Sequence, residues 1–192
     1  MVQAAIPEEA SKPLANSALL IIDMINQFDF PGGDALRRQC DDVATAIETL
    51  RQRFDEAHRP VIYVNDNFGR WRSNFEKLIE RCERAGSDGG ALARRMAPRP
   101  TDYFVLKPQN SAFYHTPLVL LLASLKAREL TLAGIAGDQC VMQTAMDAHL
   151  RDYGLQVPAD ATASITPARN RRALDYLHEV VGVDTTPVAS GG

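Results

Sequence analysis

The chain has 192 residues, a length that favours a single domain, and 45% of them are apolar, which suffices for a sizeable core. The formal net charge of -3 argues against a nucleic-acid binder. No apolar run approaches the roughly 18 residues that a membrane span needs, and the first residues lack the basic start and apolar core of a secretory signal. We therefore expect a protein that binds neither nucleic acid nor membrane.

Three cysteines, Cys40, Cys82 and Cys140, stand at wide spacing along the chain. An odd number at such spacing is not a disulfide framework and is typical of the reducing cytoplasm, which is the location we predict. Cys40 and Cys82 fall on the apolar stripes of expected helices, so we assign them to the core. Cys140 differs because it follows a glycine-rich turn near a helix start.

Short apolar runs alternate with amphipathic segments along the chain, and each run is bounded by turn residues. Strands are expected at residues 18–22, 60–64, 103–106, 130–134, 155–157 and 180–183. A helix is expected over residues 34–54, with Asp34 as its cap, and another after a capping box at 73–76. Further helices are expected over 118–128, over 139–153 and from Thr166-Pro167 onwards. Residues 85–100 predict an irregular excursion with one helical turn.

This alternation predicts an α/β fold in three layers, a parallel sheet with helices on both faces, as in Rossmann-like proteins. One domain is expected over residues 17–187. An arm at residues 1–16 precedes it, and a flexible tail at 188–192 follows it.

Ligands of open parallel sheets bind beyond the carboxyl ends of the strands. Asp23 directly follows the first expected strand, Lys107 follows the third, and Cys140 follows the turn after the fourth. Each residue alone has an ordinary structural role as a helix cap, a solvated charge or a small core side chain. Together they predict a site at one sheet edge that contains an acid, an amine and a thiol.

That combination suits acyl transfer. Free backbone N–H groups at a helix start stabilise an anion, so we expect a lowered pKa for the Cys140 thiol, lowered further by Lys107. Asp23 can accept the thiol proton as a general base. Backbone N–H groups at the turn can bind the oxyanion that forms when sulfur attacks a carbonyl.

Three segments carry a family resemblance: LLIIDMINQF (19–28), FVLKPQNSAF (104–113) and AGIAGDQCVMQTAMDAHLRDYGLQV (133–157). In order and spacing they resemble the isochorismatase-like cysteine hydrolases, which include nicotinamidases, carbamoylsarcosine and ureidoacrylate amidohydrolases, and isochorismatases. The resemblance implies a six-stranded parallel sheet and a catalytic triad, with Asp23 as general base, Lys107 as electrostatic partner and Cys140 as nucleophile.

The resemblance implies two further features. A cis peptide is expected between Ile135 and Ala136, and the Ala136 N–H, together with that of Cys140, is expected to bind the oxyanion. The chain is also expected to form a homo-oligomer, either a dimer or a tetramer.

One departure from the family concerns metal binding. Nicotinamidases of this family bind a metal through an Asp-x-His run after the second strand, but this chain reads VNDNFGRW at 64–71 and has no histidine there. Asn and a lone Asp are poor ligands for zinc or iron. We therefore expect no metal and no other cofactor, which argues against nicotinamidase activity, and we interpret Asp66 and Asn67 as structural or pocket groups. Four histidines elsewhere show no ligand spacing: His58, His115, His149 and His178.

Side chains near the strand ends are candidates for a pocket that holds a small planar substrate, with loop packing as the alternative for the aromatic ones. Arg70 and Arg72 can bind an acidic substrate or serve as surface charges. The candidate pocket residues are Phe28, Gln27, Asn65, Trp71 and Phe113.

The function that best fits these residues is hydrolysis of a C–N bond in a small amide or ureido compound, through a thioester on Cys140. Two alternatives stay open: hydrolysis of a vinyl ether, as in isochorismatases, and a non-catalytic binding protein of the same fold. Isochorismatases typically lack the nucleophilic cysteine. A thiol redox role is disfavoured because no second cysteine lies near Cys140.

Overall fold

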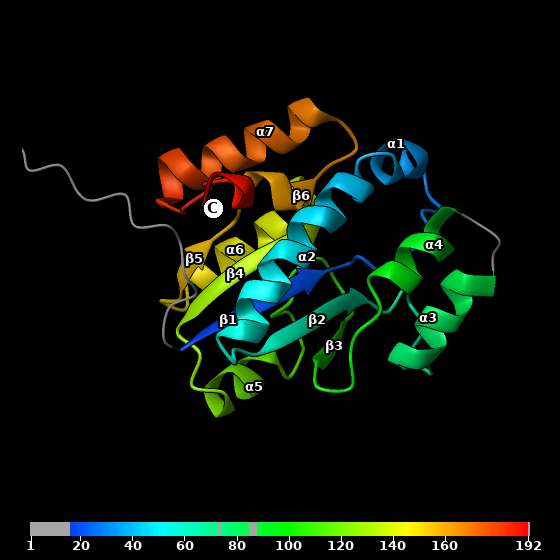
Figure 1. The fold of residues 1–192 in the computed structure, drawn as a ribbon, viewed down its shortest axis with the longest axis horizontal. Coiled ribbons are helices and arrows are strands. Elements are labelled where there is room, and N and C mark those ends of the chain that lie inside the picture. Colours follow the sequence, from blue (N-terminus) through cyan, green and yellow to red (C-terminus); the bar gives the residue numbers. More distant parts are fainter. Residues whose placement is uncertain (1–15, 73, 85–87, 192) are drawn as a thin grey trace, which may run out of the picture.

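The computed structural model describes residues 16–72, 74–84 and 88–191, so the predicted arm, apart from its last residue, and Ser73 of the predicted capping box lie outside the described residues. Six parallel strands form one sheet in the order β3-β2-β1-β4-β5, with β6 paired to β4 (Figure 1). The predicted six-stranded parallel sheet is therefore confirmed. The strands are β1 (Ser17–Ile22), β2 (Val61–Asp66), β3 (Tyr103–Lys107), β4 (Glu129–Ile135), β5 (Gly154–Gln156) and β6 (Thr162–Ala163).

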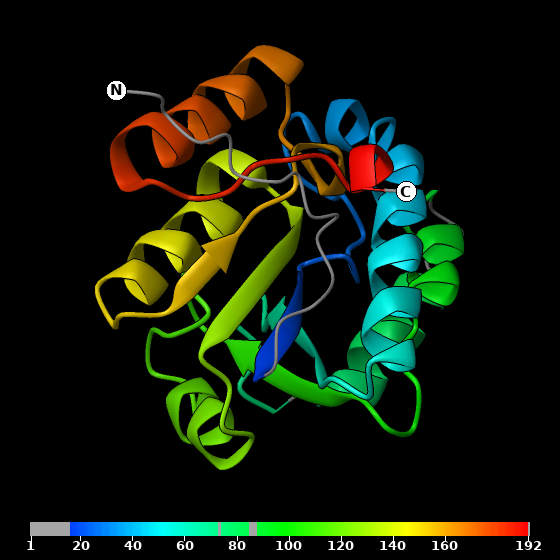
Figure 2. The same cartoon turned by 60° about the vertical axis from the view of Figure 1, so that its left-hand side comes forward.

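Helices cover both faces of the sheet, and Figure 2 shows α2 on one side of the strands and α6 on the other. None of the described helices is long and apolar enough to cross a membrane. The helices are α1 (Gly33–Arg37), α2 (Cys40–Glu56), α3 (Phe75–Arg84), α4 (Asp88–Arg95), α5 (Leu118–Ser124), α6 (Met142–His149) and α7 (Pro167–Tyr176), with short π or 3-10 turns η1 (Gly137–Val141), η2 (Ala159–Ala161), η3 (Leu177–Val181) and η4 (Val188–Gly191).

The position of β1 in the middle of the sheet explains why residues 18–22 form a continuous apolar run. Leu19 and Ile21 pack into the core cluster under α2, whereas Leu20 and Ile22 pack into the cluster on the opposite face. Successive side chains of a strand point to opposite faces, so a strand covered on both sides is apolar at nearly every position, here at all but Ser17. The apolar run thus identifies β1 as a strand buried in the middle layer.

The predicted strand at 180–183 is wrong. Val180 and Val181 belong to the turn η3, and Gly182, which follows that turn, has φ of 79°. Short apolar runs do not distinguish a strand from one helical turn. The sixth strand is β6 instead, and only Asp184 beyond η3 reaches the sheet, in an isolated bridge to Gln156.

Two helix predictions also need correction. The segment 34–54 contains two helices, α1 and α2, and Asp34 lies inside α1 rather than capping it. Residues 85–100, expected to be irregular with one helical turn, contain the two-turn helix α4. Its glycines hid it from sequence reasoning, although the packing requires at least one of them, since a Cβ on Gly89 would lie 2.3 Å from the Asn26 carbonyl oxygen.

The last described residues pack against the rest of the fold. Val188, where the predicted tail begins, is buried, and its N–H donates a hydrogen bond to the Asp160 carboxylate at 2.7 Å. The domain limits at 17 and 187 stay predictions.

Candidate active site

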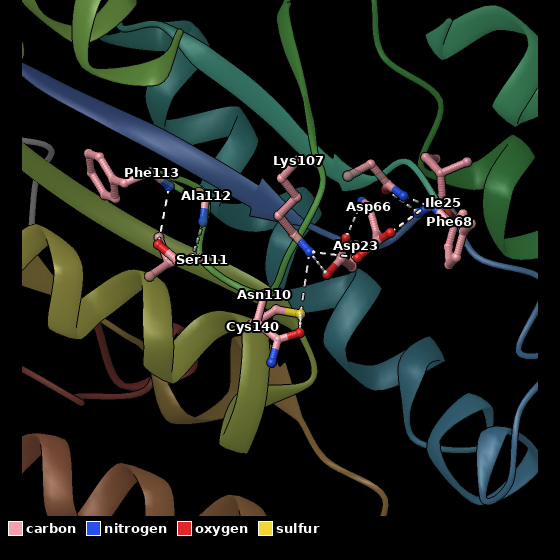
Figure 3. Close-up of polar contacts among 12 residues, drawn as sticks. Asp23, Ile25, Asp66, Phe68, Lys107, Asn110, Ser111, Ala112, Phe113 and Cys140 are labelled. Atoms are coloured by element: carbon pink, nitrogen blue, oxygen red, sulfur yellow. Dashed lines mark hydrogen bonds and ion pairs between the residues drawn. The ribbon is translucent and has the colours of Figure 1, made fainter. Parts of the chain in front are cut away.

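Three side chains from remote parts of the sequence meet at the carboxyl edge of the sheet (Figure 3). The Lys107 Nζ lies 2.8 Å from the Asp23 Oδ2 and 3.4 Å from the Cys140 Sγ. The Asp23 carboxylate lies close enough to the Cys140 thiol to raise its pKa. The structure thus brings together the acid, the amine and the thiol that the sequence placed after separate strands.

Strand register positions the carboxylates around the ammonium. In the pairing of β2 with β3, Asp66 stands opposite Lys107, and the Asp66 Oδ2 lies 3.5 Å from the Lys107 Nζ. Asp23 follows β1 in a left-handed conformation with φ of 54°, and its Oδ1 accepts a 2.7 Å hydrogen bond from the Asp66 N–H. Backbone pairing therefore fixes where each charge stands.

The turn that carries Cys140 begins with a close approach between two strands. Gly134 in β4 has φ of 118°, and a Cβ there would lie 2.0 Å from the Ile22 carbonyl oxygen, so only glycine fits. The Ile135–Ala136 peptide bond that follows is cis, at the position named from the resemblance. The chain then forms η1, which places the Cys140 sulfur in contact with the Lys107 ammonium.

A polar network that sequence reasoning missed anchors this turn from outside. The Ser164 Oγ accepts a 3.0 Å hydrogen bond from the Asp138 N–H and donates one to the Asn170 side chain. The Asn170 Nδ2 donates in turn to the Thr162 carbonyl in β6. Arg169 forms an ion pair with Asp138 at 2.5 Å. These contacts link α7 and β6 to the start of η1.

Burial and neighbouring charges act in opposite directions on the acid and the amine. Removal from water raises the pKa of Asp23, and the neighbouring Lys107 ammonium opposes that rise. Burial alone would lower the pKa of Lys107, but Asp23, Cys140 and Asp66 outweigh it, so the pKa of Lys107 lies above its ordinary value. The neighbouring charges therefore favour the charged form of Lys107, whereas burial favours the protonated form of Asp23.

The expected low pKa of Cys140 is wrong. Burial and the Asp23 carboxylate raise the pKa of this thiol to about 12, and Lys107 only partly counters them. The prediction took account of the helix start and the Lys107 ammonium, but not of the desolvation of the thiol, which depends on the folded structure. The raised pKa favours the protonated thiol form of Cys140 at neutral pH.

A cavity of about 290 Å³ opens onto the thiol. This volume suits a small ligand, since sites for drug-sized molecules begin at about 300 Å³. Ala136 and Cys140, the residues expected to bind an oxyanion, both line it. The described lining residues are Asp23, Asn26, Phe30, Pro31, Leu36, Asp66, Phe68, Asn110, Ile135, Ala136, Gln139, Cys140 and Ile165.

The five candidate pocket residues do not line this cavity. Phe28 and Phe113 are buried, and Phe113 packs against the Tyr153 ring. The Asn65 side chain is occupied by hydrogen bonds to the backbone N–H and carbonyl of Ile25. Trp71 is 80% exposed on a different groove, and Gln27 is partly buried away from the site.

Residues one or two positions away from three of these candidates line it instead. Asn26 precedes Gln27, Phe30 lies two residues beyond Phe28, and Asp66 follows Asn65. Strand alternation explains the last pair, because adjacent residues of β2 point to opposite faces. Asn110 stands inside the second quoted segment, and its Oδ1 lies 4.0 Å from the Cys140 Sγ. Proximity to Lys107 in that segment was the signal that could have identified it.

The residues after β2 do not suit a metal of the nicotinamidase kind. Asn67 accepts a hydrogen bond from the Gly69 N–H, and Asn65 is committed to Ile25. Asp66 accepts from the Phe68 N–H and contacts Lys107. Within the described ranges, no three His, Cys, Asp or Glu side chains are grouped to hold a metal ion. No step of the chemistry below involves one.

The comparisons with known proteins agree with this geometry. A family model described as "Isochorismatase domain" matches residues 17–187. The uncharacterized isochorismatase family protein YaaI of Bacillus subtilis (strain 168) is 36% identical over 172 residues, covering 90% of this chain and 94% of the relative. The ureidoacrylate amidohydrolase RutB of Stutzerimonas stutzeri (strain A1501) is 31% identical over 198 aligned residues, covering 90% of this chain and 79% of the relative.

Among solved structures, the N-carbamoylsarcosine amidase from Thermoplasma acidophilum superposes with a TM-score of 0.69 at 26% identity, covering 91% of this chain and 97% of that chain. The fold, the matched family model and the relatives all point the same way. The chain belongs to the isochorismatase family.

Proposed function

We propose that the protein is a hydrolase that cleaves the C–N bond of a small amide or ureido compound through a thioester on Cys140. The observation that carries the proposal is the position of one buried ammonium, Lys107, within 2.8 Å of a carboxylate and 3.4 Å of a thiol on a cavity wall. The similarity to amidohydrolases with ureidoacrylate and N-carbamoylsarcosine in their names supports it.

The first half-reaction forms the thioester. Asp23 accepts the thiol proton while the Cys140 Sγ bonds to the substrate carbonyl carbon, and the carbonyl oxygen becomes an oxyanion. The N–H groups of Ala136 and Cys140 bind that oxyanion. Asp23 then passes its proton to the leaving nitrogen, the C–N bond breaks, and ammonia or an amine departs.

The second half-reaction restores the enzyme. Asp23 takes a proton from a water molecule as the water oxygen attacks the thioester carbonyl. The C–S bond breaks, the proton returns to the sulfur, and a carboxylic or carbamic acid is released. Lys107 stays protonated throughout, since its raised pKa keeps it charged, and it offsets the negative charge that Asp23 and Cys140 share.

The test is ammonia release from a panel of primary amides, ureas and carbamoyl compounds. The wild type should release ammonia from at least one member, and Asp23→Asn should slow that reaction by about 1,000-fold or more, because the base is lost. Asp42→Asn, on the exposed side of α2, is the matched control and should retain activity. A folded wild type that releases no ammonia from the panel, or an Asp23→Asn variant with full activity, would contradict the proposal.

Two further expectations accompany the proposal. A homo-oligomer, dimer or tetramer, follows from the family resemblance, and light scattering of the purified chain measures it. Cytoplasmic location follows from the odd, widely spaced cysteines.

A further inference from the structure

The polar end of the cavity carries more negative than positive charge. Asp23 and Asp66 both line it, and the buried Lys107 behind them contacts both carboxylates. Among the described residues that line the cavity, none is an arginine, a lysine or a histidine. With Cys140 as a thiol, two carboxylates share one ammonium.

The negative charge of Asp66 is less completely neutralised by Lys107 than that of Asp23. Its Oδ2 lies 3.5 Å from the Lys107 Nζ, whereas Asp23 lies at 2.8 Å, so Asp23 takes the larger share of the neutralisation. The Asp66 side chain is 27% exposed, compared with 6% for Asp23. A ligand in the cavity therefore contacts the Asp66 carboxylate directly. The Lys107 ammonium contacts both that carboxylate and the Cys140 sulfur.

The rest of the cavity is neutral. Apolar side chains from the loop after β1, from α1 and from the segment after β6 contribute to the lining: Phe30, Pro31, Leu36 and Ile165. The remaining polar groups are the carboxamides of Asn26, Asn110 and Gln139, which bind hydrogen-bond donors and acceptors but carry no charge. This lining fits an apolar body attached to an amide.

The arginines that could have bound an acidic substrate lie elsewhere. Arg70 and Arg72 line a separate groove with Lys77, Arg81 and the exposed Trp71. That groove shares no described lining residue with the cavity at Cys140. A substrate carboxylate in the cavity would therefore face two carboxylates without a cationic partner at its surface.

From this arrangement, and resting on the proposed function, we infer that the substrate is an uncharged or cationic amide with an apolar body, and that Asp66 excludes anionic amides. Ureidoacrylate and N-carbamoylsarcosine, which stand in the names of two similar proteins, both carry a carboxylate, so the inference separates the substrate of this chain from both compounds in charge. Like charges held close together in a partly desolvated site repel strongly, whereas a neutral or cationic group pays no such penalty.

Three four-carbon amides test the inference: butyramide is neutral, succinamate carries a carboxylate, and γ-aminobutyramide carries an ammonium. Ammonia release should give kcat/KM values for butyramide and γ-aminobutyramide that exceed that for succinamate by about tenfold or more. Asp66→Asn keeps an acceptor for the Phe68 N–H and should shrink the ratio of butyramide to succinamate by about tenfold, whereas Asp42→Asn should leave the ratio unchanged.

The outcomes separate the two proposals. Hydrolysis of succinamate as fast as butyramide, or an unchanged ratio in Asp66→Asn, overturns the inference about charge and leaves the amidohydrolase standing. Failure of the folded wild type to hydrolyse any amide in this series or in the wider panel overturns the proposed function itself. The wild-type series needs no variant to fold, so the test of charge selection does not depend on the Asp66 substitution.

Discussion

Cys40 and Cys140 are alike in burial but differ in what surrounds them. Burial raises the pKa of both thiols to about 12. Cys40 is the first residue of the long helix α2, and its Sγ donates to the Leu36 carbonyl at 3.3 Å. Cys140 instead contacts an ammonium and a carboxylate and lines a cavity.

The surroundings, and not burial, separate the candidate nucleophile from the core cysteine. The pKa of each thiol is raised, although Cys40 begins α2 and Cys140 lies in η1. The difference lies in a base that can take the proton and a cation that remains to balance the charge. Cys40 also feels the charges of Arg37 and Asp41, so direct contact with Lys107 on a cavity wall, and not the resting pKa, distinguishes the candidate nucleophile from the core cysteine.

The largest contrast should come from removing each sulfur in turn. Cys140→Ala should lower kcat by about 10,000-fold or more, as loss of a nucleophile does in hydrolases. Cys40→Ala should keep turnover and lower the free energy of unfolding by about 1 kcal/mol, because it leaves a small cavity in the core. Ammonia release and urea denaturation measure the two effects, and equal turnover losses in both variants would erase the distinction.

Next in size is the effect of removing the cation beside Cys140. Lys107→Met should lower the free energy of unfolding by about 3–5 kcal/mol, because Asp23 would be left as an uncompensated buried charge. Adding Asp23→Asn should recover part of that loss. The matched control is Lys77→Met on the exposed side of α3, which should change stability by about 0.5 kcal/mol or less. A Lys107→Met protein as stable as that control would mean that the pair is not buried.

A smaller effect concerns pH, and it tests Asp23 as the base. Since burial raises the pKa of Asp23, the carboxylate is lost on acidification at a pH above its ordinary value of 3.8. The value of kcat/KM should therefore fall as pH falls through that raised pKa, while circular dichroism shows the chain still folded. An acid limb at or below pH 3.8 would contradict the assignment.

The smallest expected contrast is in thiol labelling. Iodoacetamide should modify Cys140, which is 9% exposed, about tenfold faster than Cys40 or Cys82, which have no exposed surface. The rate at Cys140 should rise between pH 7 and 9, because the raised pKa leaves little thiolate at neutral pH. A fast rate that does not change over this range would indicate a thiolate at rest and would restore the low pKa that the sequence predicted.

Much of the fold could be predicted because parallel strands buried on both faces need continuous apolar runs. Such runs identify β1, β2 and β4 within one or two residues. The two-residue β6 has no periodic signal, and the glycines of α4 disguise a helix whose packing needs their small size. Elements set by tertiary contacts therefore escaped sequence reasoning.

The candidate site divides in the same way. Asp23, Lys107 and Cys140 were predictable because topology alone brings the ends of parallel strands to one edge. The pocket was not, because its lining depends on loop conformations and on which face of β2 each residue occupies. The direction of the Cys140 pKa was missed because desolvation is a property of the folded chain.

The most direct measurement is to trap the acyl group that the account places on sulfur. The wild type is mixed with an activated ester of butyric acid, quenched in acid within milliseconds, and digested for peptide mass mapping. If the thioester forms on Cys140, a butyryl group is found on the peptide that contains Cys140. The Cys40 and Cys82 peptides stay unmodified, and Cys140→Ala carries no adduct. Turnover without any adduct on Cys140, or the same adduct on Cys40, would contradict a thioester mechanism at this site.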